Sequence, residues 1–408
     1  MAILALAVAV RFVAIDARLH NDDAYSWWVA SSPSPHAFLS RLAGSENTPP
    51  LFYLLLAPLP IDHPAWLRLP AAIAGILMCL ALYLALRNRL GVRAALLAAL
   101  AVAVAPFLIT NSDLARGFTL ADLALLVALW AVLELSAHGR RRWWVVFVAA
   151  GAVALYTEYD SAIFLVALTL GALWLGRPDR RRMAPAAVLP FAALIPWIPQ
   201  MVHSQHQVGL TKLNPIHGAT SLRALRDATV TLALGENGGT ASSAGRWLEL
   251  AAIAALLLCG ALLLGRRGRR HAATQAAIRL IAVTAVLILA GHAIAGALGV
   301  QVFTQRYLTI LIPLVAALVA AALDALPSRI WLVLAGLALL GLGLANAVRR
   351  YGGQYEPDFA PVRAAALAVR PREVLTDSPI VLYYLRDQHP QLDRPYNLGP
   401  GRALTCPR

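Results

Sequence analysis

Two adjacent acids, Asp22 and Asp23, follow the first apolar run of this 408-residue sequence. A carboxylate can take a proton from a hydroxyl group, and partial removal from water makes it a stronger base. Tyr25, Trp27 and Trp28 come next, and such aromatic side chains are typical of the boundary between lipid and water. Acids after an apolar helix are often only solvated charge, and aromatics there are often only anchors. Their combination favours a functional site.

Cationic side chains suited to a phosphate stand near the ends of other apolar runs. Arginine can bind phosphate oxygens through two parallel hydrogen bonds. The candidates are Arg68, Arg116, Arg306, Lys212 and His203. Taken singly, an arginine at the end of a membrane helix is also explained as a side chain that keeps its charge in water. The functional hypothesis therefore requires that arginines meet the acids in space.

Glu158 is a further acid, in the short polar break YTEYD at 156–160. An ionisable group close to membrane depth is a functional candidate by default. A divalent metal shared with Asp22 would need a cluster of ligands, but no group of His, Asp and Glu with ligand spacing supports one. The sequence therefore predicts neither a metal nor another cofactor.

The composition defines the elements that carry these residues. Hydrophobic residues make up 59% of the chain and charged residues only 14%, which is typical of a polytopic membrane protein. The net charge of +14 comes from arginines in short breaks, so it indicates topology and not a nucleic-acid partner. About eleven membrane helices are predicted, at 2–15, 67–86, 93–110, 117–136, 143–157, 160–176, 183–201, 247–265, 273–297, 306–325 and 329–347.

The arginine pattern orients these helices. Densely basic breaks are predicted in the cytoplasm, at 87–93, 138–142, 177–182 and 265–271. Breaks with little positive charge are predicted outside, at 111–117, 156–160 and 300–306. The alternation requires two helices within 143–176, joined by a turn at YTEYD. The protein is then a multi-pass plasma-membrane protein with a cytoplasmic N-terminus and an external C-terminus.

The predicted organisation is one transmembrane module over 1–347, followed by a small external segment over 348–408. The first external loop, 16–66, is expected to contain short helices at the membrane surface. A second long external loop is expected at 202–246. The C-terminal segment has β-prone stretches around a turn signal, which favours a small α/β fold.

The order of three motifs in the first loop resembles that of a known family. DDAYS at 22–26, ENTPPLFYLLL at 46–56 and LRLPAAIAG at 67–75 are similar to the first external loop of GT-C glycosyltransferases of the protein O-mannosyltransferase-like class, glycosyltransferase family 39. NSDLARGF at 111–118 and QRYLTILIPL at 305–314 resemble later motifs of that family. The likeness covers about 1–330, with a weaker match at 375–387.

The match has two departures. The family usually has Asp-Glu where this chain has Asp22-Asp23, and it has a tyrosine at the position of Phe118. The second departure weakens any role for a hydroxyl group at that position.

The resemblance implies an enzyme, a hexosyl or pentosyl transferase whose donor is a sugar on polyprenyl phosphate. The external site favours the same donor, because nucleotide sugars are not available outside. Matching the motif assigns Asp22 as general base in an inverting transfer, with Asp23 or Glu158 as a second acid. Membrane lipids are further partners, and the acceptor is left open among protein, glycan and lipid.

A polytopic transporter or lipid flippase is the alternative function. Such proteins tend to show inverted repeats and helices that are broken at matching positions. The sequence shows neither pattern.

Overall fold

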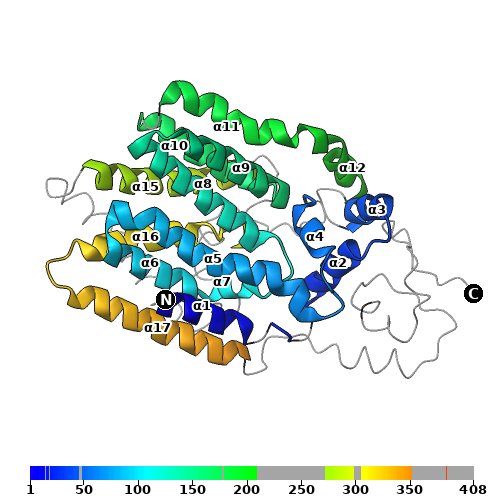
Figure 1. Ribbon diagram of the computed structural model, residues 1–408, viewed down its shortest axis with the longest axis horizontal. Coiled ribbons are helices and arrows are strands. Elements are labelled where there is room, and N and C mark those ends of the chain that lie inside the picture. Colours follow the sequence, from blue (N-terminus) through cyan, green and yellow to red (C-terminus); the bar gives the residue numbers. More distant parts are fainter. Residues whose placement is uncertain are drawn as a thin grey trace, which may run out of the picture.

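The computed structural model describes residues 1–13, 15–17, 19–45, 48–176, 179–208, 272–297, 305–351 and 383. Every regular element within these residues is a helix. Long helices lie side by side in a bundle, and the short helices α2, α3 and α4 gather at one end of it (Figure 1).

The first external loop lies between two bundle helices, α1 (Ala2–Phe12) and α5 (Pro64–Leu90). Its helices are α2 (Asn21–Ala30), α3 (Pro35–Ser45) and α4 (Leu51–Leu56). The bundle continues with α6 (Val92–Val104), α7 (Pro106–Ser112), α8 (Phe118–His138), α9 (Arg141–Thr157) and α10 (Ser161–Trp174). It is completed by α11 (Arg180–Leu194), the 3-10 helix η1 (Ile195–Trp197), α12 (Ile198–Val208), α15 (Ala272–Ala297), the 3-10 helix η4 (Gln305–Leu308), α16 (Leu311–Asp324) and α17 (Ile330–Tyr351).

The centre of the bundle is formed by α5, α6 and α8. Helix α8 packs on both α5 and α9, while α6 packs on α5 and α16. These contacts bury small and branched apolar side chains in one large core. Helix α5 begins with Pro64, which suits the first turn because the N–H that proline lacks needs no partner there. Gly91 follows the last residue of the helix, and its φ of 92° favours glycine.

The span predicted at 93–110 is broken. Helices α6 and α7 meet at a bend of 58° around Ala105. Pro106 has no N–H to bond the carbonyl of Val102, so that carbonyl needs another donor. The fully buried Arg11 supplies it, at 3.4 Å to Val102 and 3.0 Å to the carbonyl of Ala103. An arginine from α1 thus satisfies the backbone at the break.

All predicted apolar runs that fall within the described residues lie on helices, so the all-α membrane fold is confirmed. Four described helices are long and apolar enough to cross a membrane alone, and the bent pair would make a fifth. The turn predicted at YTEYD is also found, because α9 ends at Thr157 and α10 begins at Ser161. The run at 247–265 lies outside the described residues, so the number of spans stays a prediction.

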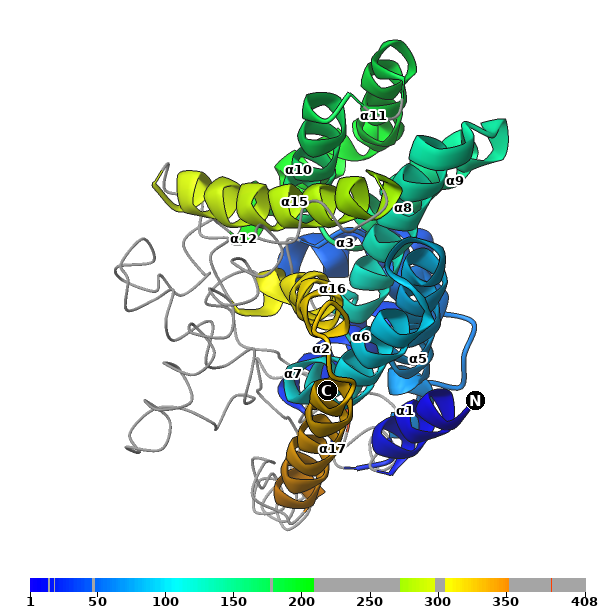
Figure 2. The same ribbon diagram turned by 90° about the vertical axis from the view of Figure 1, so that its left-hand side faces the viewer.

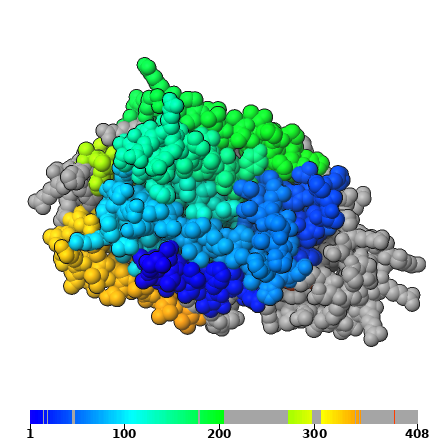
Figure 3. Space-filling view, viewed as in Figure 1, coloured from blue at the N-terminus to red at the C-terminus, as the bar shows by residue number. Residues whose placement is uncertain are grey.

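The outer helices carry the apolar surface that lipid requires. Helix α11 exposes Val188 and Leu189, and α17 exposes Leu337 and Leu344. Figure 2 shows α1 and α17 at the same side of the bundle, and Figure 3 shows α1 lying on the outer surface. The predicted α/β segment lies outside the described residues, which beyond α17 include only Tyr383.

The first external loop has a core of its own. Trp27 and Trp28 are 4% and 5% exposed, and they pack with Phe52 and Leu56 of the same loop. The structure therefore places both tryptophans inside the loop and not on its surface, because α2 turns this face toward α4 and α5. Such a core gives the acids at the start of α2 a fixed support.

Candidate functional site

The two acids occupy the first turn of α2. His20 precedes the helix, and its Nδ1 accepts a hydrogen bond from the backbone N–H of Asp22 at 3.2 Å. In return, the Asp23 carboxylate accepts the backbone N–H of His20 at 3.0 Å. This reciprocal capping begins the helix, and negative charge is favourable at a helix N-terminus. The local sequence thus fixes both carboxylates relative to the backbone.

Asp23 is fully buried and ties three segments together. Its Oδ2 accepts from Arg68 Nε at 3.1 Å and Nη2 at 2.8 Å, and its Oδ1 accepts from the backbone N–H of Ala115 at 2.7 Å. Arg68 also donates to the carbonyl of Ala17 at 2.8 Å. The predicted phosphate ligand Arg68 therefore lies against Asp23, where both charges are used to hold the loop to α5.

Asp22 lies beside its neighbour but faces different partners. Its side chain is 16% exposed, and it forms ion pairs with Arg116 at 3.1 Å and Arg306 at 2.7 Å. These arginines are 94 and 284 residues away along the chain. Burial alone would raise the pKa of Asp22, but the charges of Arg116 and Arg306, with that of His20, hold this pKa well below its usual value. The structure thus brings together one partly exposed carboxylate and two of the predicted arginines.

Arg116 is held from both sides of its loop. The carbonyl of Ala115 accepts a hydrogen bond from Ser26 at 2.5 Å, and Arg116 Nη1 donates to the hydroxyl of Tyr53 at 3.2 Å. Gly117 follows, and a Cβ there would lie 2.7 Å from Thr157 Cγ2. A larger residue would therefore push this loop off the end of α9 and shift the guanidinium.

Arg306 belongs to η4 and is one-third exposed. Its guanidinium lies 5.9 Å from the ring of Phe118, and that ring meets Tyr307 edge to face at 6.1 Å between centroids. The aromatic face at position 118 thus supports the cation without a hydroxyl group.

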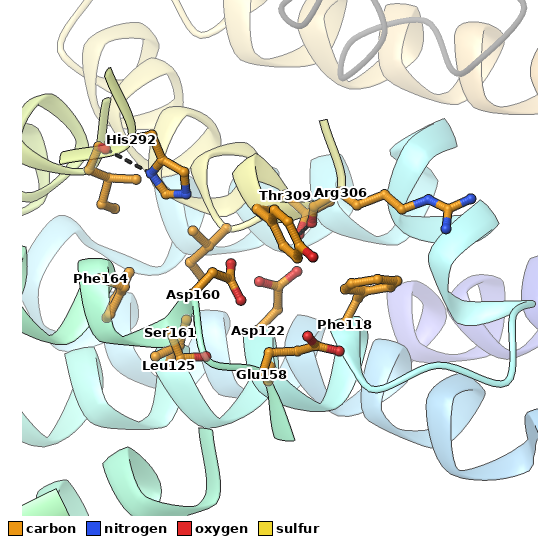
Figure 4. A pocket seen from close by; sticks show the side chains of 14 residues that line it. Phe118, Asp122, Leu125, Glu158, Asp160, Ser161, Phe164, His292, Arg306 and Thr309 are labelled. Atoms are coloured by element: carbon orange, nitrogen blue, oxygen red, sulfur yellow. Dashed lines mark hydrogen bonds between the residues drawn. The ribbon is translucent and has the colours of Figure 1, made fainter. Parts of the chain in front are cut away.

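A pocket adjoins Arg306 at the same end of α8, α10 and α15. It is lined in part by Asp122, Glu158, Asp160 and His292. Figure 4 shows the carboxyl groups of Asp122 and Asp160 close together, with Arg306 extending away from them. Burial raises the pKa of Asp160 to about 7. Glu158 thus lines the same pocket as Arg306.

The remaining predicted residues take no part in the ion pairs that join Asp22 to Arg116 and Arg306 within the described part of the chain. His203 is exposed on α12, which packs on α3, and Lys212 lies outside the described residues. Tyr25 is half-buried on α2. Within the described residues, no three His, Cys, Asp or Glu side chains are grouped so that they could hold a metal ion.

Sequence reasoning missed two parts of the site. Tyr53 belongs to one of the resembling motifs, but nothing in the motif indicates that its hydroxyl binds Arg116. Asp122 lies one turn inside an apolar run, and an acid at such a position is itself a functional signal.

Residues 48–203 match the family model described as dolichyl-phosphate-mannose-protein mannosyltransferase. No curated protein sequence matches the chain significantly.

Two solved structures share the fold. ArnT from Cupriavidus metallidurans, bound to undecaprenyl phosphate, is 17% identical with a TM-score of 0.60, and the match covers 94% of this chain and 84% of ArnT. The oligosaccharyltransferase AglB from Archaeoglobus fulgidus, in complex with an inhibitory peptide and a dolichol-phosphate, is 14% identical with a TM-score of 0.57. That match covers 100% of this chain and 61% of AglB. The predicted resemblance is confirmed at the level of the GT-C fold.

Proposed function

We propose that this GT-C membrane protein transfers a hexosyl or pentosyl group from a polyprenyl-phosphate donor to an acceptor hydroxyl at the outer face of the membrane. Asp22 acts as the general base, and the transfer inverts the configuration at the reacting carbon. The observation that carries the proposal is the meeting of Asp22 with Arg116 and Arg306.

The chemistry requires both kinds of group. Asp22 takes the proton from the acceptor hydroxyl while the oxygen of that hydroxyl forms a bond to the anomeric carbon. The bond between that carbon and the phosphate oxygen breaks, and the electron pair leaves with the polyprenyl phosphate. Arg116 and Arg306 stabilise the charge that develops on this leaving group. A single displacement of this kind inverts the carbon.

The resting ion pairs give the arginines a second effect. A carboxylate whose pKa is held low by two cations is a weak base. A phosphate that binds Arg116 and Arg306 competes with Asp22 for both, and the pKa of Asp22 then rises. The donor itself would therefore convert Asp22 from an ion-pair partner into a base.

Asp23, Arg68 and Tyr53 have positioning roles in this proposal. The Asp23–Arg68 pair fixes the first turn of α2 on α5, and Tyr53 orients Arg116. Neither side chain of the pair is free to act as a base or to bind phosphate, because each is buried against the other.

The fold supports a lipid-borne donor. The site lies at one end of a bundle whose outer helices expose apolar side chains, so a polyprenyl chain can remain in lipid while its phosphate reaches the arginines. ArnT and AglB, which share the fold, were solved with undecaprenyl phosphate and a dolichol-phosphate. The acceptor can be a protein, a glycan or a lipid that carries a hydroxyl group.

The test measures transfer and binding separately. Membranes that contain the wild type or Asp22→Asn are supplied with radiolabelled polyprenyl-phosphate sugars, including mannose and arabinose. Purified proteins are tested for binding of bare polyprenyl phosphate. We expect Asp22→Asn to lower transfer by at least about 100-fold, because a general base contributes roughly 10²–10⁴-fold, and to keep phosphate binding.

Asp16→Asn is the matched control. Asp16 lies on the same loop but is largely exposed and pairs only with His63 in the described contacts, so transfer should stay at the wild-type level. Unchanged transfer by Asp22→Asn would exclude the base assignment. A purified protein that moves lipid across vesicles but never transfers sugar would instead support the flippase.

A further inference from the structure

We infer that the pocket formed by Asp122, Ser161 and His292 binds the hydroxyl-bearing edge of the transferred sugar and so selects the donor. The inference rests on the proposed function and assigns the substrate subsite next to Arg306. It concerns residues that the transfer chemistry itself does not use.

The first support is a set of buried polar atoms without partners. Asp122 Oδ2, Ser161 Oγ and His292 Nε2 have no hydrogen-bond partner within the described part of the chain. Their residues are 5%, 2% and 2% exposed. A buried polar group without a partner is unfavourable, so three such atoms around one pocket indicate a ligand that satisfies them. All three residues line the same pocket.

The second support is the hydrogen-bonding character of these atoms. His292 Nδ1 lies 2.9 Å from the carbonyl of Ile288, so this nitrogen carries the proton and donates it to the carbonyl. The free Nε2 is then an acceptor. The Asp122 carboxylate also accepts when ionised, and the Ser161 hydroxyl can donate or accept. The pocket therefore favours an uncharged group that both donates and accepts hydrogen bonds, which is the character of a sugar hydroxyl group.

The third support is position and size. Arg306 lines the pocket with its stem while its guanidinium reaches Asp22, so the pocket lies next to the proposed phosphate site (Figure 4). The free space is about that of one water molecule. Such a space admits one hydroxyl group from one edge of a sugar, while the ring stays nearer Arg306. The anomeric carbon can then lie beside the phosphate.

A metal ion is the competing occupant. Asp122, Glu158 and Asp160 are near one another, but the described residues contain no group of three side chains arranged to hold an ion. Burial raises the pKa of Asp160 to about 7, which reduces the negative charge that a cation would need. Sugar hydroxyl groups carry no charge and can donate to these acceptors, so they fit the pocket better.

The experiment compares two ligands that share a phosphate. Binding of polyprenyl-phosphate mannose and polyprenyl-phosphate arabinose to the purified protein is measured against bare polyprenyl phosphate, for wild type, Asp122→Asn, Ser161→Ala and His292→Phe. We expect the wild type to bind one sugar-bearing lipid at least about tenfold more tightly than bare polyprenyl phosphate, which is the effect of one to two hydrogen bonds. Each variant should lose most of this preference and keep its affinity for bare polyprenyl phosphate.

His36→Phe is the matched control, since His36 is exposed on α3 and lies outside the pocket. It should keep the wild-type preference. Equal binding of all three lipids by the wild type, or an unchanged preference in all three pocket variants, would overturn the inference. A preference that appears only with added Mg²⁺ or Mn²⁺ and vanishes with EDTA would overturn the inference, because it would mean that the pocket holds a cation and not a sugar hydroxyl group.

This outcome is separate from that of the proposed function. Binding needs no base, so the preference is measurable even where transfer fails. Sugar transfer without the binding preference would overturn the inference about the pocket and leave the proposed function standing. The binding preference without sugar transfer would overturn the proposed enzyme activity and leave the inference about the pocket standing.

Discussion

Asp22 and Asp23 are adjacent in sequence, yet their surroundings differ in kind. Asp23 receives four hydrogen bonds and is completely buried, whereas Asp22 keeps a partly exposed carboxylate between two arginines. The first turn of α2 causes this difference, because successive side chains of a helix point about 100° apart. One acid can therefore be fixed as support while the other faces a ligand.

At the residue scale, we predict that Arg306→Gln moves the acid limb of the pH dependence of kcat/KM to higher pH. Arg306 lowers the pKa of Asp22, so its removal raises that pKa, and a higher pH is then needed to ionise the base. The variant should also lose about 100-fold in kcat, because a cation near the leaving phosphate is lost. The measurement is kcat/KM for transfer between about pH 2 and pH 8, because the wild-type limb lies below the usual pKa of an aspartate.

Arg279→Gln is the control for this prediction, since Arg279 is exposed on α15 and bonds Gln275 of the same helix. Its profile should match that of the wild type. An acid limb that stays in place in Arg306→Gln would mean that Asp22 is not the titrating group.

The candidate residues of the site could be named from the sequence, but their pairing could not. Asp22, Arg116 and Arg306 stand out by charge at the ends of apolar runs. The structure pairs Arg68 with Asp23, and it pairs the other two arginines with Asp22. This choice of partners depends on how α2 is rotated against α5. His292 was visible as a lone polar residue in an apolar run, but its approach to Asp122 depends on contacts between α15 and α10.

At the element scale, we predict that Asp23→Asn lowers the free energy of unfolding by about 3–5 kcal/mol, because it leaves the buried Arg68 without its counter-charge. The double variant Asp23→Asn with Arg68→Met should be less destabilised than Asp23→Asn, since it buries no uncompensated charge. Unfolding of the purified proteins in detergent, followed by tryptophan fluorescence, measures both values.

Asp16→Asn again serves as the control, because its exposed ion pair with His63 should contribute no more than about 1 kcal/mol. Equal stability of Asp23→Asn and the wild type would show that the pair does not anchor α2.

The positions of most helices follow from the length of the apolar runs and from the polar breaks between them. The turn between α9 and α10 was predicted from charge alternation, since three polar residues at 158–160 interrupt an otherwise continuous run. The bend between α6 and α7 was not predicted, because 94–109 is uniformly apolar. The signal for the bend in the sequence was Pro106. Arg11 stabilises the bend, because it donates hydrogen bonds to the carbonyls of Val102 and Ala103.

At the scale of the whole molecule, the polar and apolar parts are separated along the bundle. The large core and the lipid-facing helices occupy its length, and α2, which carries Asp22, lies at the end where the short helices gather (Figure 1). Tyr383 packs edge to face on Trp27 of that loop and donates to the carbonyl of Asp62 at 2.6 Å. Tyr383 thus contacts the loop that carries Asp22.

The last prediction concerns orientation in the membrane. Translational fusions to a reporter that is active only outside the cytoplasm should be active after Asp160 and after Arg408, and inactive after Arg182. The basic break that contains Arg182 belongs in the cytoplasm, and one further crossing by α10 separates it from the turn at 158–160. If the fusion after Arg408 is inactive and the other two behave as expected, the number of spans is even and the predicted count of eleven is wrong. An inactive fusion after Asp160 would place Glu158 and the adjacent pocket on the cytoplasmic side, where a nucleotide sugar and not a lipid-borne sugar would be the available donor.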